Sequence, residues 1–369
     1  MGYAPQAIID HAALRHNLRL ARHAANGRKV WAVIKADGYG HGMLRVARCL
    51  RDADGFAVAR LDEALQLRQA GIDRPILILA GCYTHQELNQ AADAGLQVVL
   101  HHRQQLTLLQ ETGVLPRPLS IWLKVDTGMH RLGFDSDEMP GIAQSLRNNP
   151  AVGGLNLMSH LATADDRADP AALRQCALFN SLDRSLFDAC SLANSAGLLG
   201  LPDSLADWVR PGIMLYGASP FLDTTAEEEG LRAVMTLRSR VIAVKHCRAG
   251  EHIGYGGAYV CPEAMPVAVI AIGYGDGYPR HAPSGSPVLV GGRRLPLAGR
   301  VSMDMISVDA RSLPQVQVGD EALLWGKGLA VEEIAMRAGT IAYELLCGVN
   351  QRVEFIDLFS EGESDGPRR

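Results

Sequence analysis

The chain has 369 residues, of which 47% are hydrophobic, so it can form one large domain and a smaller second one. A net charge of -4 and a pI near 6.3 argue against nucleic acid or an anionic membrane as a partner. No apolar stretch reaches the ~20 residues of a membrane span, and the first residues lack the pattern of a signal peptide.

Seven cysteines are scattered through the chain, odd in number and without a Cys-X-X-Cys pair. This usage is typical of reduced thiols and predicts a cytoplasmic protein rather than a disulfide-bonded one. No group of His and Cys residues has the spacing of metal ligands, so we expect no bound metal.

The first predicted elements are a short strand and a helix. Residues 1–9 could form a strand, although the pattern does not identify its partner. Asp10 has the position of a helix N-cap, and apolar residues recur at helical spacing from Leu14 to Ala25. We therefore expect a helix directly after Asp10.

The stretch WAVIKADGYGHG places a lysine at the tip of a strand. The apolar, β-branched run before Lys35 predicts a buried strand. Only five of the 36 basic residues are lysines, and a desolvated lysine can lose its proton and act as a nucleophile, whereas arginine keeps its charge. Taken alone, Lys35 could be an ordinary lysine that reaches solvent. Tyr39 and His41 follow closely and favour a functional site.

Short apolar runs alternate with amphipathic helices over much of the chain. Strands are predicted at Val30–Ile34, Phe56–Val58, Ile76–Leu79, Gln97–Leu100, Leu119–Val125, Gly153–Ser159, Ser191–Asn194 and Asp207–Val209, and helices at Leu61–Ala70, His85–Ala94, Arg103–Glu111 and Ala171–Phe187. Eight strand–helix units in about 200 residues predict a parallel sheet. This number favours a closed (β/α)₈ TIM-like barrel, with an open doubly wound sheet as the alternative.

The pattern changes near the acidic run at Thr225–Gly230, which is typical of a linker or an exposed loop. Beyond it, alternating segments predict antiparallel β-structure with one helix. The strands are expected at Val234–His246, Val267–Ile272 and Pro287–Val290, and the helix near Val331–Ala338. We expect the barrel at residues 10–229 and a mostly antiparallel β domain at residues 230–369, which a strand from residues 1–9 could join.

Unusual polar residues lie at the carboxyl ends of five predicted strands, where a parallel barrel has its active site. They are Lys35, Lys124 with Arg131 in the loop that follows, His160, Asn194 with Ser195, and Arg210. Each of them could be an ordinary structural residue. Together they predict a site at this end of the barrel.

The loops after the seventh and eighth strands predict an anion site. Ser195 offers a hydroxyl group, and Gly212 and Ile213 are expected to open a helix with free backbone amides. Ordinary helix capping is the alternative for either loop alone. A reactive Lys35 that faces a phosphate-binding loop implies a phosphorylated aldehyde held as an imine, and that cofactor is pyridoxal 5'-phosphate.

Several motifs point to one family. They are AVIKADGYGHG around Lys35, KVDTGMHRLGF from Lys124, MSHLA at His160, ANSAG at Ser195, VRPGIMLYG at Arg210, IGYGGAY at Tyr255, IGYGDGYPR at Tyr274 and GRVSMDM at Met303. Through them the chain resembles bacterial alanine racemases over essentially its whole length. Asp37 stands where this family commonly has Asn and Gly38 where it commonly has Ala, which puts only the local loop packing in doubt.

The resemblance implies an enzyme that interconverts L-alanine and D-alanine by a two-base mechanism on a pyridoxal phosphate aldimine. Lys35 is one base, and Tyr255 from a partner chain is the other. Arg131 and the backbone of Met303, again from the partner chain, bind the substrate carboxylate. The residues that the resemblance assigns to the cofactor are Lys35, Tyr39, Ser195, Arg210, Gly212, Ile213 and Tyr343.

The resemblance also implies supporting residues and an assembly. His160 links Arg210 to Tyr255, and Lys124, which is often carbamylated in the family, accepts hydrogen bonds from Arg131. The remaining supporting or entrance residues are Asn194, Tyr274, Asp304, Asp165, Arg280 and Arg300. The expected assembly is a head-to-tail homodimer in which the β domain of one chain caps the barrel of the other.

Three other functions fit parts of the sequence. A non-catalytic pyridoxal phosphate carrier shares the barrel but lacks a substantial C-terminal β domain. A racemase of serine, lysine or many amino acids, or a decarboxylase, could use a similar scaffold. A structural dimer with a degenerate site would not need this set of chemical residues. The predicted alanine racemase either supplies D-alanine for peptidoglycan or degrades it.

Overall fold

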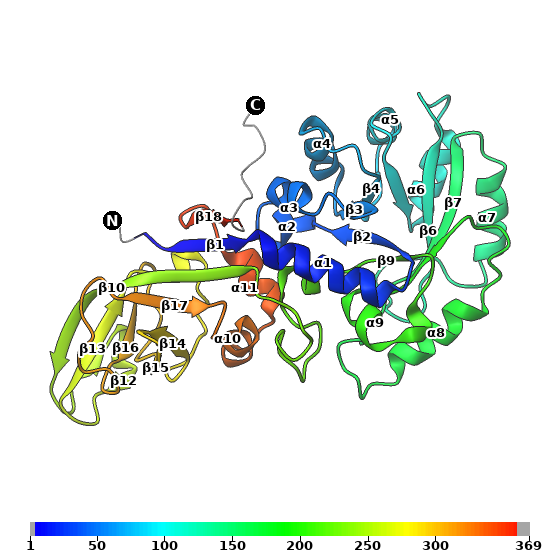
Figure 1. Cartoon of the computed structure of the whole chain (residues 1–369). Helices are drawn as coiled ribbons and strands as arrows, with labels where there is room; N and C mark the ends of the chain where they lie inside the picture. Colours follow the sequence, from blue (N-terminus) through cyan, green and yellow to red (C-terminus); the bar gives the residue numbers. More distant parts are fainter. Residues whose placement is uncertain (1–3, 360–369) are drawn as a thin grey trace.

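The computed structural model describes residues 4–359 and has two lobes (Figure 1). One lobe is a closed barrel of parallel strands, β2 to β9, and the other is built mainly from antiparallel strands. The predicted barrel followed by a β domain is therefore confirmed, and the open sheet is excluded because β9 pairs with β2. The outer ends of the expected domains, residues 1–3 and 360–369, lie outside the described residues.

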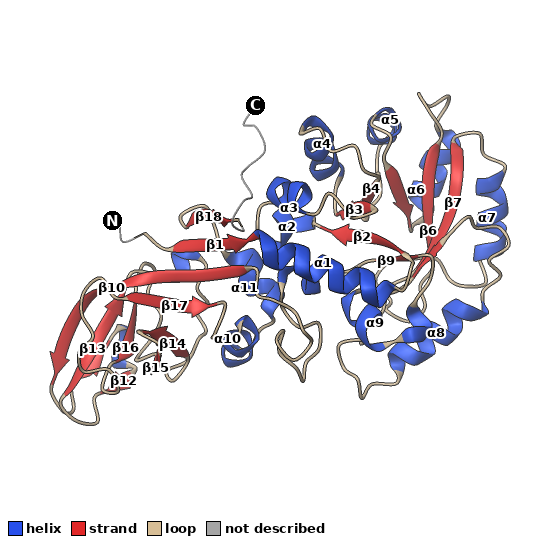
Figure 2. Ribbon diagram, viewed as in Figure 1, coloured by secondary structure: helices blue, strands red, loops and turns tan. Residues whose placement is uncertain are grey.

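The barrel strands are surrounded by helices, so they are buried on both faces (Figure 2). The strands are β2 Lys29–Val33, β3 Gly55–Val58, β4 Ile76–Ile78, β5 Gln97–Leu100, β6 Leu119–Lys124, β7 Val152–Met158, β8 Cys190–Ser191 and β9 Trp208–Val209. The helices of this lobe are α1 His11–Ala25, α2 Lys35–Tyr39, α3 Met43–Cys49, α4 Leu61–Gln69, α5 His85–Asp93, α6 Arg103–Glu111, α7 Met139–Arg147, α8 Ala171–Ser181 and α9 Ser195–Gly200.

Most predicted barrel elements are confirmed, with some errors in their ends. The Asp10 side chain caps α1 by accepting the N–H of Ala13 at 2.9 Å, as expected from the sequence. The strand expected at Ser191–Asn194 is shorter in the structure, where β8 ends at Ser191. The predicted end of α8 at Phe187 is wrong, because Leu182 already has an extended backbone with φ -69° and ψ 142°.

Three tryptophans fill the barrel interior. Trp31 of β2 stacks on Trp208 of the neighbouring β9, with ring centroids 4.2 Å apart, and contacts Trp122 of β6 edge-on at 6.2 Å. Trp31 and Trp122 are almost completely buried. These large side chains close the barrel across its axis and leave the carboxyl ends of the strands for a site.

The second lobe contains one large sheet and two helices. Its elements are β1 Gln6–Asp10, β10 Met235–Cys247, β11 His252–Ile253, β12 Tyr259–Val260, β13 Met265–Ile270, β14 Pro287–Val290, β15 Arg293–Pro296, β16 Ile306–Asp309, β17 Glu321–Trp325, α10 Val331–Ala338, α11 Ala342–Gly348 and β18 Glu354–Leu358. The expectation of one helix is wrong, because α11 follows α10. The strand β1 lies between β10, to which it is antiparallel, and β18, to which it is parallel.

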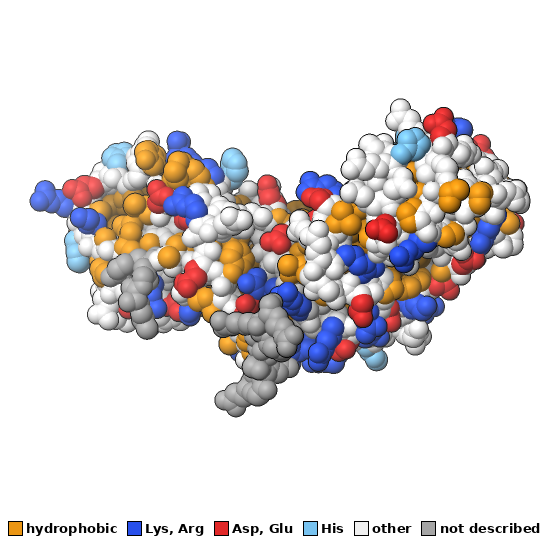
Figure 3. Space-filling view, turned by 90° about the horizontal axis from the view of Figure 1, so that it is seen from above, with side chains coloured by type: hydrophobic (Ala, Val, Ile, Leu, Met, Phe, Trp, Pro, Cys, Tyr) orange, Lys and Arg blue, Asp and Glu red, His pale blue; other side chains and the backbone are white. Residues whose placement is uncertain are grey.

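The acidic segment between the lobes is a folded turn rather than a loose linker. The Glu228 carboxylate accepts the backbone N–H of Thr225 at 2.7 Å. Glu332 of α10 accepts the N–H groups of Ser219 and Ala226 at 2.7 and 3.0 Å, which ties this turn to the second lobe. A hollow separates the lobes on the face shown in Figure 3. No helix within residues 4–359 combines the length and the hydropathy that crossing a membrane requires.

Candidate active site

A cavity of about 620 Å³ lies at the carboxyl ends of the barrel strands and has the size of a cofactor site. The predicted site residues that line it are Lys35, Tyr39, Lys124, Arg131, His160, Asn194, Ser195, Arg210, Gly212, Ile213 and Tyr343. The structure thus brings together residues from several strand ends and from α11.

Lys35 is the first residue of α2 and follows β2 almost directly. Burial lowers the pKa of its amine, and the Arg131 cation lowers it further, whereas Glu63 and Cys347 oppose this shift. A lower pKa increases the share of neutral amine at neutral pH. The neutral amine is the form that can act as a base or as a nucleophile.

The turn after Lys35 is left-handed. The residues Ala36, Asp37, Gly38 and Tyr39 have φ angles of 53°, 51°, 63° and 52°. This conformation costs about 1–2 kcal/mol for each residue that is not glycine, and it persists only where the surroundings hold it. The Glu63 carboxylate contributes, because its Oε1 accepts the N–H of Ala36 at 2.9 Å. The strained turn fixes the direction in which the chain leaves Lys35.

Both departures from the family pattern lie in this turn, and the packing accommodates them. The Asp37 carboxylate accepts the N–H of Met43, the first residue of α3, at 2.7 Å and so satisfies one of the backbone donors that a helix start leaves unpaired. Gly38 has a positive φ, and a Cβ there would approach Val46 to 3.0 Å and the Met43 nitrogen to 3.3 Å. Glycine therefore relieves both backbone strain and crowding at this position.

His41 is fully buried behind the turn. Its Nδ1 donates to the carbonyl oxygens of Gly38 and Tyr39, at 3.1 and 2.9 Å, and its ring packs on Tyr216 with centroids 4.7 Å apart. Burial lowers the pKa of His41 to about 4, so the ring is neutral at physiological pH. His41 thus holds the backbone of the turn without adding charge.

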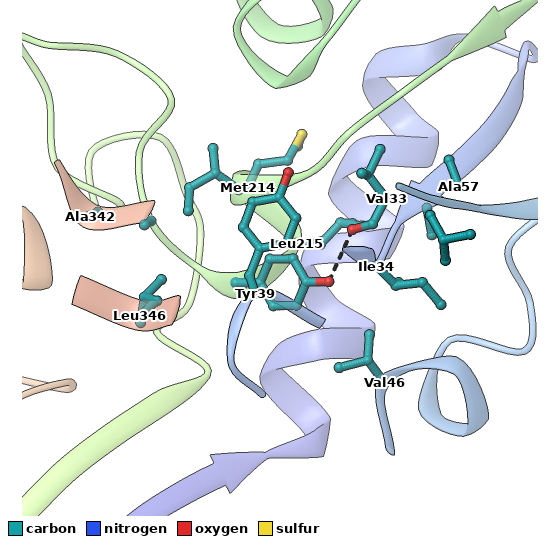
Figure 4. Close-up of a cluster of buried hydrophobic side chains, with 14 of the residues drawn as sticks. Val33, Ile34, Tyr39, Val46, Ala57, Met214, Leu215, Ala342 and Leu346 are labelled. Atoms are coloured by element: carbon teal, nitrogen blue, oxygen red, sulfur yellow. Dashed lines mark hydrogen bonds between the residues drawn. The ribbon is translucent and has the colours of Figure 1, made fainter. Parts of the chain in front are cut away.

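Tyr39 lies among buried apolar side chains that include Met214, Leu215 and Leu346 (Figure 4). Its ring stacks on that of Tyr216, with centroids 4.6 Å apart. Burial raises the pKa of the Tyr39 phenol, and it raises that of the nearby Tyr343 phenol to about 12. Both hydroxyl groups therefore stay protonated and can donate hydrogen bonds into the cavity.

Ser195 and Gly212 meet at one end of the cavity. Ser195 Oγ accepts the backbone N–H of Gly212 at 2.8 Å. A Cβ at Gly212 would come within 2.4 Å of the Tyr39 hydroxyl, so a larger residue would displace that hydroxyl. The helix expected after Gly212 is a short 3₁₀ helix, η2 Ile213–Tyr216. The Ser195 hydroxyl accepts this bond and can still donate its own O–H, as can the nearby Tyr39 hydroxyl, and hydroxyl donors of this kind suit an oxyanion such as a phosphate.

Arg210 follows β9 and is only 4% exposed. Its guanidinium donates to the carbonyl oxygens of Ser159 and Leu192 and to the Ser191 hydroxyl. Burial lowers the pKa of Arg210 to about 10, which leaves it charged at neutral pH. Burial and the Arg210 cation hold the pKa of His160 well below its usual value. His160 is therefore neutral, and its Nδ1 can accept from Arg210 at 3.4 Å.

Lys124 ends β6 and is 8% exposed. Burial, together with the Arg210 and Arg131 cations, lowers the pKa of its amine to about 8. Arg131 lies in the next loop, which Asp126 braces by accepting the backbone N–H groups of residues 128–130 at 2.9 to 3.1 Å. The cavity thus holds several basic groups close together, and their repulsion favours neutral amines.

Within the described part of the chain, seven predicted site or entrance residues do not line the cavity, and three of them are Asp165, Arg280 and Arg300. Within residues 4–359, Tyr255, Met303, Tyr274 and Asp304 belong to the second lobe and do not line the cavity. Tyr255 is 68% and Met303 51% exposed. The N–H of Gly275 donates to the Met303 carbonyl at 2.8 Å, so the Tyr274 turn and the Met303 loop are neighbours. Asp304 pairs with Arg352.

Two residues near Lys35 were not predicted. Glu63 occupies the third position of α4, where a capping glutamate is common. The sequence could therefore have predicted its role as a helix cap. Its bond to Ala36 depends on tertiary structure and has no sequence signal. Cys347 lines the cavity from α11, a short helix that the periodicity did not reveal.

Two family models match the chain and cover most of it. Residues 9–220 match the model "Alanine racemase, N-terminal domain", and residues 234–356 match "Alanine racemase, C-terminal domain". Both matches fall on the lobes described above.

Individual relatives are similar over nearly the whole length. The chain is 52% identical to the alanine racemase of Nitrosococcus oceani over 350 residues, which covers 95% of this chain and 98% of the relative. It is 49% identical to the alanine racemase of Coxiella burnetii over 358 residues, with the same coverage. The crystal structure of the biosynthetic alanine racemase from Pseudomonas aeruginosa superimposes with a TM-score of 0.94 at 44% identity, covering 97% of this chain and 100% of that one. The chain belongs to the alanine racemase family.

Proposed function

We propose that the chain is a pyridoxal phosphate-dependent enzyme that interconverts L-alanine and D-alanine. The observation that carries this proposal is one cavity that contains both the Lys35 amine, with its lowered pKa, and the hydroxyl donors of Ser195 and Tyr39. Membership of the alanine racemase family supports alanine as the substrate. The D-alanine would serve peptidoglycan synthesis, or the reverse reaction would consume it.

The cavity residues fit pyridoxal phosphate. Lys35 offers the amine that an aldehyde requires, and Ser195, Ile213 and the phenols of Tyr39 and Tyr343 can hold the phosphate. The glycine next to Ile213 leaves space that a Cβ would fill. When bound, the cofactor supplies an aldehyde and an electron-withdrawing ring that acidifies the substrate Cα–H.

Arg210 is the proposed partner of the pyridine nitrogen. A guanidinium has five N–H donors and no acceptor, so it can only donate to that nitrogen. Burial and bonds to Ser159 and Leu192 hold the side chain in place. Arg210 would therefore leave the nitrogen unprotonated and limit how far the ring withdraws electrons.

Lys35 Nζ and Tyr255 Oη are the proposed bases on the two faces of the substrate. The neutral Lys35 amine, which burial favours, can take a proton from Cα or return one to it. Tyr255 is exposed and lies outside its own chain's cavity within the described residues, so its phenol has to reach a second copy. The neutral His160 beside Arg210 is the proposed link between that cation and the phenol.

Arg131 is the proposed ligand of the substrate carboxylate. Its guanidinium can form two parallel hydrogen bonds, which would fix the direction of Cα–H, and the Met303 backbone of a second copy would add another donor. Lys124 lies beside it, and a neutral Lys124 amine can combine with CO₂ to form a carbamate and release a proton. We propose this modification because it replaces a repulsive cation by an acceptor for Arg131.

The proposed assembly is a head-to-tail homodimer. In it the second lobe of one copy, with Tyr255, Tyr274, Met303 and Asp304, closes the barrel cavity of the other. The exposure of Tyr255, Tyr274 and Met303 supports this assembly, because such large side chains are usually covered. We also propose a cytoplasmic location, which the seven free cysteines support.

Absorption and circular dichroism together test the function. We expect purified protein with pyridoxal phosphate to gain a visible absorption band, and L-alanine to lose its optical activity when the protein is added. Lys35→Ala should show neither the visible absorption band nor the loss of optical activity. Lys29→Ala is a matched control, because Lys29 is an exposed lysine at the other end of β2. Alanine interconversion by the Lys35→Ala variant would refute the proposal.

A further inference from the structure

The Glu63 carboxylate joins two elements at the edge of the cavity. Its Oε2 accepts the backbone N–H groups of Ala59 and Arg60, at 2.7 and 3.1 Å, and so caps α4. Its Oε1 accepts the N–H of Ala36, the residue next to Lys35, at 2.9 Å. One side chain therefore fixes both the start of α4 and the strained turn after the lysine.

The neighbouring helix shows what capping alone requires. Glu87 has the same third position in α5, and its Oε2 accepts the N–H groups of Tyr83 and Thr84 at 2.6 and 3.2 Å. Oε1 of Glu63 accepts the N–H of Ala36 beside the cavity. Among the described residues, Glu87 accepts no such hydrogen bond from a residue beside the cavity. The bond between Oε1 of Glu63 and the N–H of Ala36 is therefore not required for capping a helix.

Glu63 also differs in charge from the other groups around the lysine amine. These groups are Arg131 in the loop after β6, Lys124 at the end of β6, His160 after β7, Cys347 on α11, and Glu63 on α4. Arg131 lowers the pKa of Lys35, and Lys35 in turn lowers those of Lys124 and His160. Glu63 is the carboxylate in this set, and it opposes the fall in the pKa of Lys35.

We propose that Glu63 is a positioning residue for the racemisation, which holds the left-handed turn that orients Lys35 and provides a negative charge near the amine. Glu63 does not line the cavity, so it acts through Lys35 and not on the substrate. This inference rests on the proposed role of Lys35 as a base.

Kinetics of the holoenzyme with three variants test the proposal. In Glu63→Gln we expect kcat to fall about tenfold to a hundredfold, because a base displaced by a fraction of an ångström transfers protons poorly, while KM changes by less than about twofold. The acid limb of the pH profile of kcat should move to lower pH, because Lys35 loses a nearby negative charge that favours its protonated form.

Two further variants serve as controls. Glu63→Asp keeps the negative charge and should return the acid limb to its wild-type pH, although its shorter side chain leaves kcat low. Glu87→Gln makes the same change at a helix cap that, among the described residues, has no hydrogen bond to the turn after Lys35, and it should keep the wild-type kcat and limb.

Chemical labelling gives a readout that does not depend on racemisation. The full-length chain, freed of cofactor, is acetylated at a series of pH values, and modification of Lys35 is compared with that of exposed Lys29 by peptide mass spectrometry. We expect the pH midpoint for Lys35 to fall in Glu63→Gln and to stay unchanged in Glu87→Gln. The inference would be overturned if Glu63→Gln had the same pH midpoint for Lys35 labelling, and the same kcat, as Glu87→Gln. A wild-type chain that labels as expected but does not racemise alanine would instead overturn the proposed function.

Discussion

At the scale of single residues, Lys124 shows how neighbours set the chemistry of one amine. Its pKa of about 8 means that the neutral form grows as the pH rises through this value. Only the neutral amine reacts with CO₂, so we expect the carbamate on Lys124 to increase from about pH 6 to about pH 9. Carbon-13 NMR in labelled bicarbonate would measure it.

A conservative replacement controls the Lys124 experiment. Lys124→Arg keeps a cation at the end of β6 but cannot form the carbamate. Its spectrum should lack the part of the carbamate signal that comes from Lys124. The other amines should contribute equally to the spectra of both proteins. Equal carbamate signals from the two proteins at every pH would show that Lys124 stays unmodified.

Residues at strand ends were predictable, whereas residues that support them were not. The carboxyl ends of parallel strands meet at one edge, so Lys35, His160 and Arg210 could be placed together from the sequence alone. Cys347 lines the same cavity from an unpredicted helix, and Glu63 bonds the residue next to Lys35 from a helix cap. Their approach depends on how distant segments pack, and a local sequence pattern does not carry that information.

At the scale of elements, the left-handed turn depends on a neutral His41. The pKa of this ring is about 4 in the folded chain and about 6.5 in an unfolded one, so between these values only the unfolded chain binds the proton. Folding stability should therefore fall as the pH drops through this range, by about 2 kcal/mol from His41 between about pH 7 and pH 5.

Denaturant unfolding of two proteins isolates the His41 contribution. Asparagine at position 41 keeps an N–H donor but does not titrate, so His41→Asn should lose less stability than the wild type between the two pH values. Other buried groups such as His160 affect both proteins equally. An identical pH dependence would contradict a neutral His41 in the folded chain.

Long periodic elements were predictable, and short or strained ones were not. The fifteen residues of α1 have a clear apolar period and an Asp10 cap. By contrast, α2 has five residues, and its backbone departs from a normal helix at Ala36. Gly38 is a sequence signal for a positive φ angle, but the positive φ angles of Ala36 and Tyr39 have no such signal, because tertiary contacts stabilise them.

At the scale of the whole molecule, the proposed bases lie in different lobes. If Lys35 and Tyr255 act together only across a dimer, Lys35→Ala and Tyr255→Phe chains should each be inactive and should complement each other. A mixed dimer has one site with both substitutions and one with neither. Random pairing of equal amounts should therefore restore about a quarter of the wild-type activity.

Differently tagged chains make the complementation measurable. Mixed dimers can be purified through both tags, and their activity compared with that of each variant alone. Inactive mixed dimers would mean that Tyr255 does not act on the barrel of its partner. The sequence pattern predicted two domains, but only the family resemblance implied how two copies meet.

The position of β1 has a consequence for how the protein is made. Gln6 lies opposite Arg238 of β10 and Glu354 of β18. The strand β1 is therefore synthesised long before either of the strands with which it pairs. While the ribosome is still translating, both edges of β1 are open to wrong pairing. The last strand to emerge then covers the first, and a nascent chain that stops before residue 354 keeps one of those edges bare.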